Sequence, residues 1–174
     1  MHEEAFIREI LADPKDDVAR QVYADWLEEQ ADPVASAKAE YLRATVELLG
    51  LSGKEKQQGR RLLQWLAARF DKSWLAVVSR LAVENCLGER VKPHSRYPLR
   101  FDYVCERGWE DLQTTTDAKV RYCEGCSQQV HYCDSLDQAR DHADVGHCVA
   151  VDLAVERREG DLERPRSMTV GMLA

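Results

Sequence analysis

The segment Lys119-Val-Arg-Tyr-Cys-Glu-Gly-Cys-Ser-Gln-Gln-Val-His-Tyr132 specifies the architecture of the C-terminal half of the chain. Apolar and polar residues alternate on both sides of Cys123-Glu-Gly-Cys126, a pattern that predicts a β-hairpin with a tight turn. The C-x2-C spacing in such a turn is that of a zinc knuckle, in which both thiolates point to one ion. We expect Gly125 to relieve the backbone where the turn curls around the ion.

The cysteines of the chain are concentrated around this hairpin. Five of the six follow residue 104. In a reducing cytosol such clustering favours metal binding or redox chemistry over structural disulfides. The six residues are Cys86, Cys105, Cys123, Cys126, Cys133 and Cys148.

Chain geometry separates the candidate ligands from one another. Cys133 lies seven residues after Cys126, which corresponds to ~23 Å along an extended strand. A helix of about ten residues, beginning at Asp134 or Ser135 and ending near Gly146, would return the chain by ~15 Å and bring Cys148 to the knuckle. A final strand is expected over 147–153, and an earlier one over 99–104 ends at Cys105. The predicted ligands are Cys105, Cys123, Cys126 and Cys148.

Two residues remain as alternative ligands, namely Cys133, which we otherwise interpret as a small buried apolar side chain, and His147 beside Cys148. Four thiolates would close the coordination sphere of one structural Zn²⁺ ion, and iron would fit the same sulfur cage. A metal-free fold and a redox pair at Cys123 and Cys126 are further alternatives. Surface or near-site roles are expected for His94, His131 and His142, and a core position is expected for Cys86.

The first 85 residues carry helical periodicity. Helices are predicted over 3–12, from Asp16 or Asp17, from Pro33 to about Leu49, after residue 54, and from Trp74. Short connections favour antiparallel packing into a bundle. The expected buried faces follow the helical spacing of apolar residues. They are Val18, Val22 and Trp26 widened by Tyr23 and Leu27, then Tyr41, Leu42, Thr45, Leu48 and Leu49, and then Leu62, Leu66 and Phe70 with Leu63 and Trp65 adjoining. The fold class is therefore α+β, an all-α bundle followed by a small β-rich domain with one helix.

The N-terminal sequence Phe6-Ile-Arg-Glu-Ile-Leu-Ala-Asp-Pro-Lys-Asp-Asp-Val-Ala-Arg-Gln-Val-Tyr-Ala-Asp-Trp-Leu-Glu-Glu resembles the bacterial repeat-companion domain of planctomycetes and myxobacteria. The resemblance spans roughly residues 3–51. No activity is generally assigned to that family, so the resemblance implies an accessory role based on protein interactions.

The C-terminal half resembles bacterial zinc-ribbon-like modules over about residues 103–153. The matching positions are Cys105, Trp109, Arg121-Tyr-Cys123, Cys126, Val130 and Cys148. Together the two resemblances imply a helical domain over 1–88, a connector over 89–100, a zinc-ribbon-like domain over 101–155 and a polar tail over 156–174.

Charge is unevenly distributed along the chain, whose formal net charge is -7. Residues 53–100 hold 11 basic and 4 acidic side chains, whereas residues 1–52 hold 5 basic and 12 acidic ones. The basic stretch could contact a polyanion, pack against the acidic helices, or be solvated. Its residues are Lys54, Lys56, Arg60, Arg61, Arg69 and Lys72.

We expect a non-catalytic bacterial adaptor or regulatory protein whose partner is another protein. Nucleic-acid binding through the helix 54–72 is the alternative, disfavoured because the cysteine-rich half is acidic. A nucleophile with its base is not recognisable, so no enzymatic activity is predicted. The sequence shows neither a membrane-spanning stretch nor a secretory leader after Met1, which predicts a cytoplasmic location. Trp109 is expected to pack beneath the metal site or, alternatively, to contact the partner.

Overall fold

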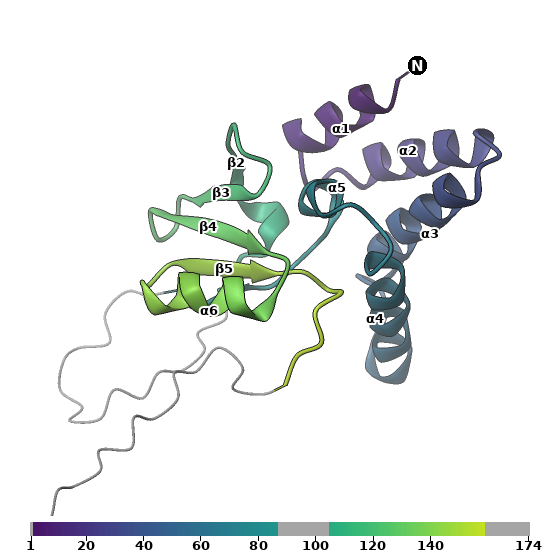
Figure 1. The fold of residues 1–174 in the computed structure, drawn as a ribbon. Coiled ribbons are helices and arrows are strands. Elements are labelled where there is room, and N and C mark those ends of the chain that lie inside the picture. The colour runs from purple at the N-terminus through teal and green to yellow at the C-terminus, as the bar shows by residue number, and fades with distance from the viewer. Residues whose placement is uncertain (1, 87–104, 159–174) are drawn as a thin grey trace, which may run out of the picture.

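The structure, a computed structural model, describes residues 2–86 and 105–158 (Figure 1). It confirms the α+β class, with helices preceding a mixed five-stranded sheet. The predicted strand over 99–104, the connector over 89–100 and the tail from residue 159 lie outside the described residues.

Five helices form the N-terminal half. The second and third begin at the start signals expected from the sequence, whereas the fifth begins at Lys72, two residues before the prediction, because Asp71 caps it. Asp16 accepts hydrogen bonds from the backbone N–H groups of Val18 and Ala19, and Asp32 precedes Pro33 at the first helical position. Such caps satisfy donors that have no partner inside the helix. The helices are α1 (Glu3–Ala12), α2 (Asp17–Glu29), α3 (Pro33–Glu47), α4 (Gly53–Ala67) and α5 (Lys72–Val78).

The buried face of α2 differs from the prediction. Tyr23 and Leu27 are buried as predicted, but Val18 and Val22 are 65% and 50% exposed. Arg20 is fully buried and donates a hydrogen bond to the carbonyl oxygen of Val78 at the end of α5, so the side of α2 that carries Arg20 and Tyr23 faces inward and the two valines face outward. The predictions for Leu49 and Leu62 are wrong, since both are exposed, whereas Leu63, predicted beside that face, is buried.

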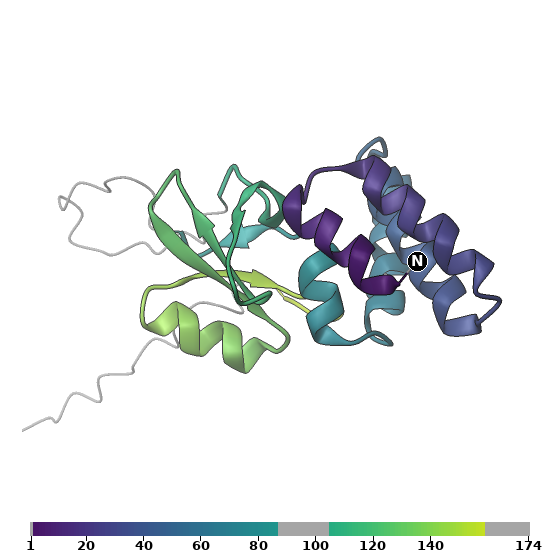
Figure 2. The same ribbon diagram turned by 90° about the horizontal axis from the view of Figure 1, so that it is seen from above.

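The sheet has the strand order β1-β5-β4-β3-β2. Its hairpin is the predicted one, with Cys123 opposite Gln128. Strands β4 and β5 run parallel, and α6 (Leu136–Asp144) connects them across one face of the sheet (Figures 1 and 2). The strands are β1 (Val83–Glu84), β2 (Gln113–Thr114), β3 (Val120–Cys123), β4 (Gln128–Cys133) and β5 (Cys148–Val151).

The helices and the sheet share one continuous cluster of buried side chains. Trp109, in the short helix η1 (Trp109–Asp111), is fully buried and donates from its indole nitrogen to the carbonyl oxygen of Ala76 at 2.8 Å. It is therefore packed inside and cannot be a surface contact. Lys72 also links the halves through an ion pair of 2.9 Å with the buried Asp152. Among the described helices, each is too short or too polar to cross a membrane.

Candidate metal centre

Side-chain alternation along the strands sorts the cysteines onto the two faces of the sheet. Cys123 and Cys148 belong to the large buried cluster, together with Val130. Cys133 lies in a separate small cluster with Val149 and Ala139 of α6. Since neighbouring residues of a strand point to opposite faces, Cys133 lies on the face away from Cys123 and Cys148. Its side chain is fully buried, and burial raises the pKa of its thiol to about 12.

The other predicted ligands gather at one end of the opposite face. Cys123 ends β3, Cys126 lies in the following turn, and Cys148 begins β5 opposite Val130. The backbone N–H of Cys105 donates to the carbonyl oxygen of Val83 at 2.7 Å, which places it beside β1. Cys105 and Cys126 are half-buried against the cluster that holds Cys123 and Cys148.

The turn at Cys123–Cys126 favours a thiolate. Burial acts to raise the pKa of Cys123, but hydrogen bonds from the backbone N–H groups of Cys126 and Gly125, a side-chain hydrogen bond with Cys126 and the positive charge of Arg107 lower it below its usual range. The pKa of Cys126 is raised to about 11 by burial and by the adjacent Cys123 thiol. One thiolate is thus already stabilised by the backbone, as a metal ligand requires.

The expected role of Gly125 is not the observed one. The left-handed conformation in this turn belongs to Ser127, with φ of 55°, whereas the described glycines with positive φ are Gly53 and Gly146. Gly125 instead makes room for Arg107, because a Cβ atom at this position would approach the Arg107 Nε within 3.2 Å. The glycine therefore allows a guanidinium to lie against the turn, where it offsets thiolate charge.

Cys86 is buried in the core, as the sequence predicts, but its contact with Cys148 was not foreseen. It follows β1, which pairs with β5, and its thiol contacts that of Cys148. The side-chain hydrogen bond with Cys148, burial, and the nearby thiols of Cys105 and Cys126 raise the pKa of Cys86 far above its usual range. Cys86 thus neighbours Cys148, Cys123 neighbours Cys126, and Cys105 lies near them, but among residues 2–86 and 105–158 no three of these thiols lie close enough together to be counted as a group that could hold an ion. Strand periodicity before Cys86 would have indicated its position in the sheet, but β1 has only two residues and shows no such pattern.

This donor set fits the ion implied by the sequence. Thiolate sulfur is the ligand that tetrahedral zinc and iron sites prefer, and five cysteines lie at this end of the sheet, although four of their thiols would have to move closer together to share one ion. A closed shell of four thiolates leaves no position for a water molecule, so the ion would supply folding free energy and no catalysis.

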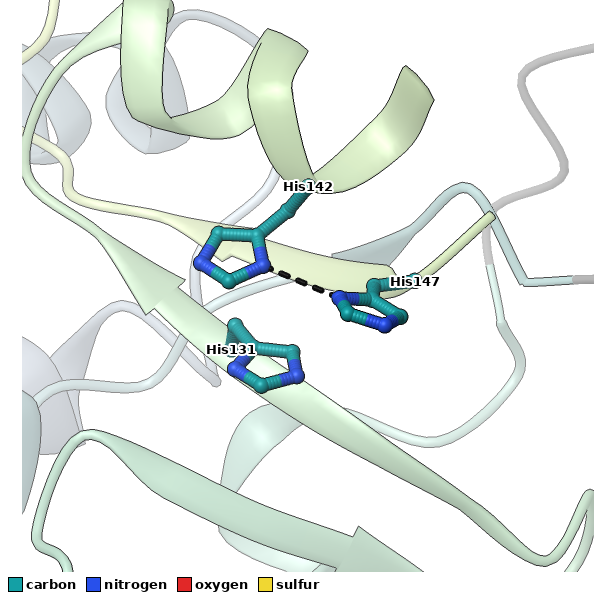
Figure 3. Close-up of side chains that lie close together, drawn as sticks. All are labelled: His131, His142 and His147. Carbon is teal, nitrogen blue, oxygen red and sulfur yellow. Dashed lines mark hydrogen bonds between the residues drawn. The ribbon is translucent and has the colours of Figure 1, made fainter. Parts of the chain in front are cut away.

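The histidines occupy the other face of the sheet. His131, His142 and His147 come together, with one nitrogen of each ring lying within 4.8 Å of the others (Figure 3). His147 is therefore turned away from the thiols, although it precedes Cys148 in sequence. The sequence predicted surface or near-site positions for His131 and His142 and did not predict that they lie together. His94 lies outside the described residues.

The basic stretch is mostly solvated. Lys54, Arg60 and Arg61 are exposed on α4, and the guanidinium of Arg69 lies 3.4 Å from the centre of the exposed Trp65 ring. Lys56 is half-buried, and Lys72 pairs with Asp152. The acidic residues of α1 and α2 pair with other cations, Glu3 with Lys38, Asp25 and Glu28 with Arg43, and Asp17 with Arg80.

Comparison with known proteins identifies no relative of this chain. The chain matches no family model, and neither a curated protein nor a solved structure is significantly similar to it.

Proposed function

We propose that this chain is a non-catalytic bacterial protein that binds one structural zinc ion and acts by contacting another protein in the cytoplasm. The observation that carries the proposal is the gathering of thiols from four chain segments at one end of the sheet, with one thiolate stabilised by backbone N–H groups. The sequence pattern and the side-chain contacts both favour the same three ligands, namely Cys123, Cys126 and Cys148. The fourth is Cys105 by spacing or Cys86 by its contact with Cys148.

The size of the sheet explains why an ion would be needed. Strands β1 and β2 contain two residues each, so few backbone hydrogen bonds hold the edges. The core shared with the helices stabilises the sheet, but short edge strands bury little apolar surface of their own. An ion held between β3, β5 and the chain after β1 would tie together three strands that are not consecutive in sequence.

Exposed apolar side chains support a protein partner. Val18 and Val22 lie one turn apart on α2 and are both at least half exposed. Trp65 on α4 is 53% exposed, and Leu62 is its neighbour one turn earlier. Exposed aromatic and aliphatic residues of this kind supply much of the binding energy at protein interfaces. The resemblance of the N-terminal segment to repeat-companion domains agrees with this interpretation.

The test combines metal analysis with partner capture from the native organism. Purified full-length chain should contain zinc, and a Cys148→Ser variant should lose it. The tagged wild-type chain should capture the same partner protein in repeated experiments. The Val22→Glu and Trp65→Glu variants should fail to capture it, whereas an Arg8→Glu variant, changed at an exposed position of α1, should still do so. A folded wild type that holds no ion refutes the metal centre. Equal recovery by all the variants refutes the interaction surface.

Nucleic-acid binding is the second candidate, favoured by one observation. Exposed Arg60 and Arg61 share α4 with Trp65, whose ring lies under the Arg69 guanidinium, and base stacking with basic residues is typical of single-strand binding. If the candidate holds, affinity for a single-stranded oligonucleotide should fall steeply with salt, and Arg60→Glu with Arg61→Glu should abolish it. Absent or salt-independent retention would eliminate this function.

A further inference from the structure

Three imidazoles meet on the face of the sheet that α6 covers, opposite the thiols. His131 belongs to β4, His142 to the last turn of α6, and His147 directly precedes β5 (Figure 3). Their ring nitrogens form the only group of three or more metal-ligating side chains within such a short distance among residues 2–86 and 105–158. Neither the sequence pattern nor the proposed zinc centre uses this group.

The end of α6 fixes two of the rings. Gly146, with φ of +85°, donates its N–H to the carbonyl oxygen of Ala143, and His147 donates its N–H to that of His142, both at 3.0 Å. This is the Schellman pattern, which brings the second residue after the helix back over its last turn. The Nδ1 atoms of His142 and His147 consequently lie 3.1 Å apart. The side-chain amide of Asn85 also holds the carbonyl oxygen of His147 at 2.8 Å.

The sheet fixes the third ring. His131 pairs with Val149 in the parallel register of β4 and β5, and its side chain projects toward α6. Its ring centroid lies 4.1 Å from that of His142 and 4.8 Å from that of His147. A strand, a helix end and a hydrogen-bonded turn therefore position the rings, an arrangement more rigid than a surface loop.

We infer that His131, His142 and His147 form a second metal site, which binds one divalent late transition-metal ion such as Zn²⁺ reversibly. Imidazole nitrogen suits zinc, copper and nickel, whereas magnesium and calcium select oxygen ligands. Three protein ligands leave a fourth position for water or for a side chain of a partner. His147 is exposed, so the ion exchanges with solvent, in contrast to the ion proposed among the buried thiols.

The distances require only local adjustment. In a tetrahedral zinc site with Zn–N bonds of about 2.0 Å, ligand nitrogens lie roughly 3.3 Å apart. The pair His142–His147 lies at this spacing through a hydrogen bond between its Nδ1 atoms, and an ion bound there would replace the shared proton. His131 must rotate its ring from the stacked position so that its nitrogen turns to the same point. Burial, together with the neighbouring rings, lowers the pKa of His131 and His142, which keeps nitrogen lone pairs available at neutral pH.

If the three histidines only pack against one another, the protein binds no ion at this place. A metal titration distinguishes that alternative from the proposed site. Full-length protein, first dialysed against a weak chelator, is titrated with Zn²⁺ by calorimetry and with Co²⁺ by absorption. We expect one additional reversible equivalent, whose cobalt spectrum shows d–d bands without sulfur charge transfer. His142→Gln and the exposed His147→Gln should each weaken it by more than about tenfold. His2→Gln should bind like the wild type, and Mg²⁺ should not compete.

The titration distinguishes metal binding by the histidines from metal binding by the thiols. A tightly retained ion with sulfur charge transfer in its cobalt form reports the thiols, and the reversible equivalent reports the histidines. The inference is overturned if wild type takes up no reversible equivalent, or if the His142→Gln and His147→Gln proteins, folded by circular dichroism, bind it as the wild type does.

Discussion

The guanidinium of Arg121 lies 4.5 Å from the centre of the Trp109 indole ring and donates a hydrogen bond of 2.7 Å to the Trp109 carbonyl oxygen. Arg121 also donates to the carbonyl oxygens of Ala76 and Val77 at the end of α5. Burial and the like charge of Arg20 lower the pKa of Arg121 to about 10, so it remains charged at neutral pH. A cation at the end of a helix is favourable, and this one joins the sheet to the helices.

Replacing Arg121 by Met should therefore destabilise the whole chain. Met fills part of the space but removes three hydrogen bonds from a buried cation. The Ala76 oxygen keeps its bond from Trp109 and the Trp109 oxygen its bond from Leu112, so the expected loss in the free energy of unfolding is roughly 3 kcal/mol. Urea unfolding followed by tryptophan fluorescence measures the change. The matched control is Arg8→Met on the exposed side of α1, which should change the free energy by less than about 0.5 kcal/mol. Equal losses in the two variants would contradict the role given to Arg121.

Stability should also depend on Glu3 at acidic pH. Burial acts to raise the pKa of Glu3, but hydrogen bonds from Lys38 and Tyr23 outweigh it and hold the pKa below its usual range. A carboxyl whose pKa is lower in the folded state contributes stability above its unfolded pKa, and this contribution is lost as the pH falls through the folded value. Glu3→Gln should flatten the decline of the unfolding midpoint below about pH 4.5. A decline as steep as that of wild type would show that Glu3 does not contribute.

The helices of the N-terminal half were predictable because local chemistry decides where they begin. Asp16, Asp32 and Pro33 act on the neighbouring backbone, independently of the rest of the fold. The buried face of α2 was not predictable in the same way. Val18 and Val22 form an apolar stripe at helical spacing, yet Arg20 is the buried residue, because its partner is a carbonyl oxygen 58 residues further along the chain.

In the candidate site, too, the features set by neighbouring residues could be predicted, and those set by contacts between distant segments could not. The hairpin spacing placed Cys123 and Cys126 in one turn, and the expected length of the following helix brought Cys148 back to them. Cys133 was set aside because of its distance along the strand, whereas the structure separates it by the face of the sheet on which it lies. The contact of Cys86 with Cys148 was missed because a two-residue strand carries no periodicity. The histidine group was missed because it depends on the parallel register of β4 with β5 and on the turn at Gly146.

The fourth ligand can be identified by comparing two single substitutions. The thiol of Cys86 contacts that of Cys148 and is more deeply buried than that of Cys105. We therefore expect Cys86→Ser to lose most of its tightly bound zinc and Cys105→Ser to keep it, as measured by elemental analysis after dialysis. The opposite pattern would establish Cys105, the ligand predicted from spacing. Zinc retention by both variants would mean that either thiol can complete the site.

The most direct test of the metal centre is the amount of tightly held metal in wild type, Cys148→Ser and Cys133→Ser, measured by elemental analysis after dialysis against a weak chelator. Wild type and Cys133→Ser should each retain one zinc ion per chain, because the Cys133 thiol lies on the opposite face of the sheet. Cys148→Ser should retain little and unfold at a lower temperature. A folded wild type without metal, or equal retention in the Cys148→Ser protein, would contradict the account.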